Sequence, residues 1–308
     1  MNPTAATPED ASWPPIPTRL LVHALVREDG TVDAGDLYSV AGLLGMTDQQ
    51  VRLCVKRLVK EGRFTHEGRG RKALLRATPD ASGAVAPDVD LVRHAYRQDH
   101  GLAPWNGTWH LFAFAVSESR RTARDALRDT LLYLGAAPLQ GGLYVCANPI
   151  TPLVEIRARE LGLSGSLTHL TSDDLCVGGL TDPTALAAAL WPLDEIAKRH
   201  SRLARLAGAC LDRIDAAEPL TGPERLTMAV RLAAAFTEAM EPDPLLPPEL
   251  LPQPWEGTKA RRLAAACWSE LAEADSADGA SPSGPRLFSL YEGVMDDPEP
   301  NGGEHRPG

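Results

Sequence analysis

The sequence predicts an α+β protein of several domains, and three observations support this. Residues 18–78 contain three short helical patterns followed by a strand pair, residues 90–180 alternate strand-like and helix-like segments, and residues 181–275 have helical periodicity. With 308 residues, 44% of them hydrophobic and 23% charged, the chain has an ordinary globular composition and room for two or three domains. We expect these three ranges to be its domains.

The N-terminal range 18–78 is predicted to form three helices and a β-hairpin. Thr18 is placed to cap the first helix, and residues 34–44 fit the second. Thr47 and Gln50 have the spacing of a capping box that begins the third helix. Three short helices and a hairpin within about 60 residues predict a winged helix-turn-helix.

The third helix is predicted to separate apolar from basic residues. Successive residues are turned by about 100° around a helix axis, so Val51, Cys54, Val55, Leu58 and Val59 form one apolar arc. The opposite arc has no acidic residue, is interrupted only by Leu53, and consists of Gln49, Gln50, Arg52, Lys56, Arg57 and Lys60. A solvated helix face is the alternative, but like charges one turn apart destabilise a helix. We therefore interpret this arc as a surface that reads DNA.

The predicted hairpin is basic at its tip. Strands are expected at 63–66 and 71–77, and the turn places Arg69, Arg71 and Lys72 beside glycines. Such a turn fits contact with phosphates or a minor groove, although alone it could equally be a flexible basic turn. The residues predicted to bind DNA are Thr47, Gln49, Gln50, Arg52, Lys56, Arg57, Lys60, Arg69, Arg71 and Lys72.

The charge distribution favours the same interpretation. The whole chain has a formal net charge of −10, yet residues 49–76 contain nine Lys and Arg against two Asp and Glu. A basic footprint on an acidic protein attracts phosphate to one surface and repels it elsewhere. We expect double-stranded DNA as a partner.

The middle range 90–180 is predicted to be a ferredoxin-like sandwich. Its segments are a strand at 105–116, a helix at 117–134, a weak strand at 137–140, a strand at 143–147, a helix at 153–161 and a strand at 167–170. This order, β-α-β-β-α-β, is the ferredoxin-like order.

The last part of the chain is predicted to be helical and then disordered. Helices are expected at 185–213, 223–240 and 257–274, with a Pro-rich strap at 241–254 between the last two. A linker is expected at 79–87 because Pro, Ser, Gly and Asp dominate there. The composition of residues 276–308 predicts a disordered tail.

Several protein classes are not favoured by the sequence. The five cysteines are far apart and lack metal-ligand spacing, so free thiols in a reducing cytosol are expected rather than a zinc site. No apolar run approaches the length of a membrane span, and the N-terminus lacks the charged start of a secretory signal. We expect a cytoplasmic protein without a cofactor, a metal or a membrane partner.

Several motifs occur in the order typical of one known family. They are Val51 to Gly62, Gly68-Arg69-Gly70-Arg71, Trp105-Asn106-Gly107-Thr108-Trp109, Gly141-Gly142-Leu143-Tyr144, and Asp243-Pro244-Leu245-Leu246-Pro247 followed by Trp255-Glu256-Gly257. On these motifs the chain, over roughly residues 18–275, resembles the PaaX-like regulators, the phenylacetate-degradation repressors.

The resemblance implies a winged helix, a Cas2-like central domain and a helical C-terminal domain. It also implies a dimeric repressor of a catabolic operon that leaves its operator when an aromatic acid or an acyl-CoA binds. The side chains considered as candidates to bind that effector are Trp105, Trp109, Arg124, Arg128 and Trp255. Core packing is the alternative for the tryptophans, and a solvated helix face is the alternative for the arginines.

The alternative function is a Cas2-like, metal-dependent nuclease or assembly protein that carries a winged helix. Phosphodiester cleavage of this kind needs carboxylates that converge on a divalent ion. The first middle strand contains no acid, Glu118 comes just after it, and Asp173-Asp174 follows the last strand. We therefore predict that the protein is not an enzyme.

Overall fold

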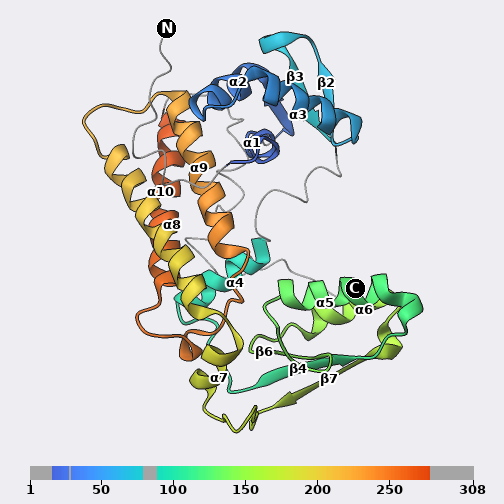
Figure 1. Ribbon diagram of the computed structural model, residues 1–308. Helices are drawn as coiled ribbons and strands as arrows, with labels where there is room; N and C mark the ends of the chain where they lie inside the picture. Colours follow the sequence, from blue (N-terminus) through green and yellow to red (C-terminus); the bar gives the residue numbers. More distant parts are fainter. Residues whose placement is uncertain (1–15, 28, 79–88, 278–308) are drawn as a thin grey trace, which may run out of the picture. The chain divides into compact units, whose positions relative to one another are not determined.

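The computed structural model describes residues 16–27, 29–78 and 89–277 (Figure 1). The predicted linker at 79–87 and nearly all of the predicted tail at 276–308 lie outside these residues. Contacts divide the chain into two compact units. The first holds Met1–Val92, His200–Glu238 and Lys259–Gly308, and the second holds Arg93–Arg199 and Ala239–Thr258.

The N-terminal part of the first unit has three helices and a three-stranded antiparallel sheet. In chain order the elements are α1 (Thr18–Ala24), β1 (Thr31–Asp33), α2 (Ala34–Leu43), α3 (Asp48–Lys60), β2 (Phe64–Glu67) and β3 (Leu74–Ala77). The strands lie in the order β1-β3-β2, and β1 pairs with β3 through Val32 and Leu75. The sequence predicted the hairpin but not β1, whose three residues are too few to show a strand pattern.

The first helix does not begin as predicted. Pro17 occupies the N-cap without a side-chain hydrogen bond, so Thr18 lies inside the helix and does not cap it. The helix ends at Ala24 because the chain turns toward β1. Asp29 holds this turn by accepting hydrogen bonds from the backbone N–H (2.9 Å) and the hydroxyl (2.6 Å) of Thr31. The second helix begins at Ala34 as predicted, and the side chain of Asp33 caps it.

The second unit contains the predicted β-α-β-β-α-β arrangement. Its elements are β4 (Trp109–Phe114), α5 (Arg121–Tyr133), β5 (Ala137–Gln140), β6 (Leu143–Cys146), α6 (Thr151–Glu160) and β7 (Leu167–Ser172). The sheet is antiparallel in the order β5-β6-β4-β7, with the first strand at its centre. The weak strand at 137–140 is therefore present. Gly141 and Gly142 both have positive φ, as a two-residue hairpin turn before β6 requires.

Both faces of this sheet carry packed layers, but the edge strand β7 remains largely exposed, with Leu170 48% exposed. Phe112 of β4 faces α5 and α6, which lie over one side of the sheet in Figure 1. Trp109 and Leu111 face the other side, because side chains alternate along a strand. There they pack with residues of α7 (Pro183–Leu190) and with residues further along the chain, namely Leu186, Ala187, Trp191, Leu193, Ile196, Leu246, Leu250 and Trp255.

The remaining helices are α4 (Val89–Asp99), α8 (Leu193–Ile214), α9 (Gly222–Met240) and α10 (Glu256–Ala277). Of these, α4 was not predicted from the sequence. The single helix predicted at 185–213 is broken between α7 and α8. Trp191 is extended there, with φ −120° and ψ 144°, because it precedes Pro192. In the part of the chain that the structure describes, no helix is long and apolar enough to cross a membrane.

The Pro-rich strap packs with the sheet of the second unit. The backbone oxygen of Leu245 accepts hydrogen bonds from Asn148 Nδ2 (2.8 Å) and from Gln98 Nε2 (2.9 Å). Asp243 Oδ1 accepts a hydrogen bond from the backbone N–H of Leu245 at 2.8 Å. The range 181–275, expected as one helical domain, is thus divided between the two compact units.

Gly135 lets the strap approach the end of α5. It has φ +86°, and a Cβ added to it would overlap the carbonyl group of Pro244. Its own carbonyl accepts a hydrogen bond from Trp191 Nε1 at 3.0 Å. A side chain at this position would therefore push the strap away from the sheet.

We predict that Gly135→Ala destabilises the protein more than Gly179→Ala. Gly179 has nearly the same φ, +87°, but no atom within 4 Å of an added Cβ, so it is the matched control for backbone strain alone. Strain should cost about 1 kcal/mol in both variants, and the overlap with Pro244 should add roughly 1–3 kcal/mol. Urea unfolding followed by tryptophan fluorescence measures both. Equal losses in the two variants would show that the strap does not pack on Gly135.

Candidate nucleic-acid interface

The start of α3 is fixed by its capping box, as the sequence predicted. Thr47 Oγ1 accepts a hydrogen bond from the backbone N–H of Gln50 at 3.2 Å, and Gln50 Oε1 accepts one from the backbone N–H of Thr47 at 2.7 Å. Two of the backbone donors at the helix N-terminus are thereby satisfied. The cap also sets where each later side chain of α3 lies around the helix.

The two predicted arcs of α3 are present. Val51 and Leu58 are fully buried, whereas Cys54, Val55 and Val59 are half-buried beside them. Burial raises the pKa of the Cys54 thiol, which favours the uncharged form. The exposed residues of the helix and its cap are Thr47, Asp48, Gln49, Gln50, Arg52, Leu53, Lys56, Arg57 and Lys60. All seven predicted DNA-binding residues in this segment therefore face solvent. Asp48 is turned about 60° from Val51 around the helix axis, so it lies outside the basic arc.

The cations of α3 are not neutralised by carboxylates of the described chain. Within that part of the protein, Arg52, Lys56, Arg57 and Lys60 form no ion pair. Glu61 follows the helix directly, but it pairs with Arg19 of α1 at 2.9 Å. The like charges at successive turns of the helix are thus left to solvent or to an anion from outside.

The turn between β2 and β3 is basic and packs against α2. It contains a short 3-10 helix at Gly70–Lys72, so β3 begins at Leu74 and not at residue 71 as predicted. The guanidinium of Arg71 lies 5.8 Å from the ring centroid of Tyr38, a cation–π contact. Ala34 donates its backbone N–H to the carbonyl of Ala73 at 3.1 Å. These contacts restrain a turn whose Arg69, Arg71 and Lys72 side chains remain exposed.

Three of the five candidate effector-binding residues lie on one face of the second unit's sheet. Trp105 and Trp109 make an edge-to-face contact, with ring centroids 5.2 Å apart. Trp109 is only 1% exposed, and Trp255 packs in the same cluster. Trp105 is half-buried and donates its Nε1–H to the carbonyl of Thr108 at 3.2 Å. Packing in the core is thus an observed role of Trp109 and Trp255.

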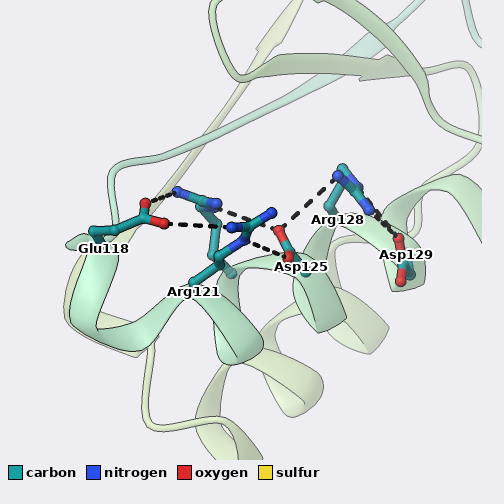
Figure 2. A network of polar contacts seen from close by, with 6 residues as sticks. Glu118, Arg121, Asp125, Arg128 and Asp129 are labelled. Atoms are coloured by element: carbon teal, nitrogen blue, oxygen red, sulfur yellow. Dashed lines mark hydrogen bonds and ion pairs between the residues drawn. The ribbon is translucent and has the colours of Figure 1, made fainter.

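The two arginines weighed with them lie elsewhere, on α5, which covers the opposite face of the sheet. Acidic residues neutralise them: Arg124 pairs with Glu118 at 3.0 Å. Arg128 pairs with Asp129 at 3.0 Å, as Figure 2 shows. Asp125 lies between the arginines of this helix and contacts Arg121 at 3.5 Å. The structure therefore does not bring the five predicted effector residues together, because α5 packs on the face of the sheet that carries Phe112, whereas the tryptophans pack on the opposite face.

The acids considered for metal chemistry also have other partners. Glu118 belongs to the ion-pair network of α5, and Asp174 accepts a hydrogen bond from the hydroxyl of Ser172 at 2.7 Å. Among the residues that the structure describes, no three His, Cys, Asp or Glu side chains are grouped so that they could hold a metal ion.

Two family models match the chain. The PaaX protein central Cas2-like domain matches residues 102–187, and the PaaX-like protein C-terminal domain matches residues 191–278. Together they cover more than half of the sequence. The chain belongs to the PaaX-like family. The resemblance drawn from the sequence motifs is confirmed, and the sheet with α5 and α6 is the Cas2-like domain of this PaaX-like protein.

One solved structure similar to this PaaX-like chain is described as "Uncharacterized protein Rv0674 from Mycobacterium tuberculosis". It is 20% identical, the match covers 85% of this chain and 96% of that chain, and the TM-score is 0.47. No match was found among the curated proteins.

Two contacts at the interface were not found by sequence reasoning. Tyr38 holds Arg71 although 33 positions separate the two residues, and Arg19 pairs with Glu61 across 42 positions. Neither pair has a local sequence signal, because the partners meet only after the helices have packed. Both contacts order the edges of the basic surface.

Proposed function

We propose that this PaaX-like protein is a DNA-binding transcriptional regulator whose residues 18–78 form a winged helix-turn-helix. The exposed, acid-free face of α3 is the observation that carries the proposal. A helix that presents Arg, Lys and Gln from its first turns has the side chains that pair with base edges in the major groove. PaaX-like proteins are a family of regulators, which agrees with this role.

Electrostatics explains why duplex DNA is the proposed partner. Arg52, Lys56 and Lys60 follow one another at single-turn spacing, so each raises the free energy of the others in the unbound helix. Phosphates relieve this repulsion, and binding also releases the counterions condensed on DNA. The whole chain has a net charge of −10, so the part outside the basic surface is acidic and disfavours other orientations on the duplex.

The basic turn at Gly70–Lys72 is proposed to act as the wing. Arg69, Arg71 and Lys72 are exposed there, as contacts with the phosphate backbone or a minor groove require. The cation–π contact with Tyr38 orders Arg71 before DNA arrives, so less side-chain entropy is lost on binding. A single helix and wing offer few contacts, and we therefore propose that the protein binds as a homodimer to a two-fold operator.

We expect Arg52→Ala and Lys56→Ala to weaken binding to duplexes that the full chain selects from a random-sequence library. Each loss should be roughly 1–3 kcal/mol if the side chain reaches a base edge, and sequence preference should relax at one position. Gel-shift titrations at fixed salt measure the affinities, and a footprint over two related half-sites would support the dimer. Lys198→Ala is the control, since Lys198 is an exposed lysine of α8 paired with Glu195.

Three outcomes would contradict this proposal. The first is wild-type affinity in both α3 variants, which would remove α3 from the DNA interface. The second is selection of no sequence by the wild-type chain. The third is Mg²⁺-dependent cleavage of the duplex, which would favour the nuclease alternative.

We further propose that the regulator is a repressor released by an aromatic acid or its acyl-CoA, bound beside Trp105. Trp105 is half-buried and covers Trp109 edge to face, so an aromatic ring could stack on Trp109 only after displacing it. Such displacement distinguishes two states of the domain, and an effector acts only by binding one state more tightly. Arg124 and Arg128 have no part in this site, because they lie on the opposite side of the sheet and are ion-paired.

A panel of aromatic acids and their CoA thioesters, titrated into the gel-shift assay, tests the effector. At least one compound is expected to release DNA and to raise the melting temperature of the protein. Trp105→Ala should keep its DNA affinity but no longer release DNA when that compound is added, because it lacks the side chain whose displacement distinguishes the two states. If no compound changes either the gel shift or the melting temperature, ligand sensing is refuted while DNA binding is unaffected.

A further inference from the structure

The basic face of α3 contains one apolar side chain that the proposed function does not yet use. Leu53 is 57% exposed, more than any other large apolar side chain in the described part of the protein. It is neither part of the core formed by Val51 and Leu58 nor covered by the hairpin. An apolar side chain exposed to water does not gain the favourable free energy of burial. Its presence within a polar surface therefore suggests a partner that covers it.

Helix geometry places Leu53 near the middle of the basic face. At about 100° per residue it is turned roughly 200° from Val51, the side chain at the centre of the buried arc. Its neighbours one turn away on α3 are Gln50 on one side and Lys56 and Arg57 on the other. Each of these is exposed. Leu53 therefore points where the helix would come closest to the bases if this face entered a major groove.

The surroundings of Leu53 favour DNA over another protein as its partner. The buried core of a protein interface is depleted of charged residues, whereas the surface one turn on either side of Leu53 is polar or cationic. In the major groove, every base pair presents donors and acceptors, and a thymine adds a 5-methyl group. Leucine cannot hydrogen-bond to the polar edges but can pack against the methyl group, because both are apolar. Opposite another base, it would leave a desolvated donor or acceptor without a partner.

We propose that Leu53 recognises the 5-methyl group of a thymine and so sets one base of the operator. The proposal rests on the assignment of α3 as the DNA-reading helix. It adds a specificity determinant that acts through apolar contact, whereas Arg52 and Lys56 act through hydrogen bonds and charge.

Deoxyuridine tests the proposal, because it differs from thymidine only in lacking the methyl group. Duplexes are first selected from a random library with the wild-type chain, and each thymine of the site is then replaced singly by deoxyuridine. We expect one replacement in each half-site to weaken wild-type binding roughly fourfold, the value of one buried methyl-sized group. Leu53→Ala should bind the two duplexes equally well.

The control variant is Leu43→Ala. Leu43 is 48% exposed and lies at the end of α2. Its replacement therefore removes an exposed leucine side chain and leaves the basic face of α3 unchanged. This variant should discriminate thymine from uracil as the wild type does. Neither substitution removes core packing, and circular dichroism melting verifies that both variants are folded.

The outcomes separate this inference from the proposed function. If the wild type selects a site but no thymine-to-uracil change alters its affinity, or if Leu53→Ala keeps the wild-type ratio, the role of Leu53 is refuted and DNA reading by α3 stands. If the wild type binds no duplex at all, both proposals are refuted.

Discussion

Burial of Val51 and Leu58 fixes which side of α3 faces water, and the properties of the basic surface follow from it. Both side chains are at most 1% exposed, so rotating the helix about its axis would expose them and bury cations. Burying unpaired Arg or Lys costs far more than burying leucine gains. The capping box then fixes the first turn, so that the positions of Arg52, Leu53 and Lys56 are determined together. The repulsion among the cations is a consequence of this packing, and DNA binding is the proposed relief.

The two faces of the sheet in the Cas2-like domain are covered by different kinds of structure. One face is covered by α5 and α6, as the ferredoxin-like arrangement provides. The other is covered by α7 and by the strap, which has few backbone hydrogen bonds of its own and is instead held by the side chains of Gln98 and Asn148. Gly135 permits the close approach, and Trp191 closes the contact with its indole N–H. The tryptophans of the family motif are therefore structural parts of this layer.

The sequence predicted elements whose signals are local. The capping box at Thr47 and Gln50, the two arcs of α3 and the weak strand at 137–140 were all found from residue types and spacing. Features that depend on tertiary contacts were missed. The strand β1 exists only because it pairs with β3. The helix break at Trp191 was missed for another reason, because Pro192 directly after it is a local signal for a helix boundary that the prediction of one helix at 185–213 did not take into account.

In the candidate sites too, features with a local sequence signal were predicted, and features that depend on tertiary contacts were not. The exposure of the basic residues on α3 followed from helix periodicity alone, because one helix face contains them all. The effector residues were chosen from three separate segments, and periodicity says nothing about how segments meet in space. The tryptophans pack on one face of the sheet and α5 covers the other, so the α5 arginines lie away from them, and Glu118 and Asp129 neutralise those arginines.

The salt dependence of DNA binding tests the central claim most directly. The affinity of the full chain for a selected duplex is measured between about 50 and 200 mM salt, and log Kobs is plotted against log salt concentration. The account predicts a negative slope of about 0.9 per phosphate contacted, reduced by about one unit in Lys60→Gln and in Arg69→Gln but unchanged in Arg157→Gln of α6. A slope near zero, or the wild-type slope in both interface variants, would contradict it.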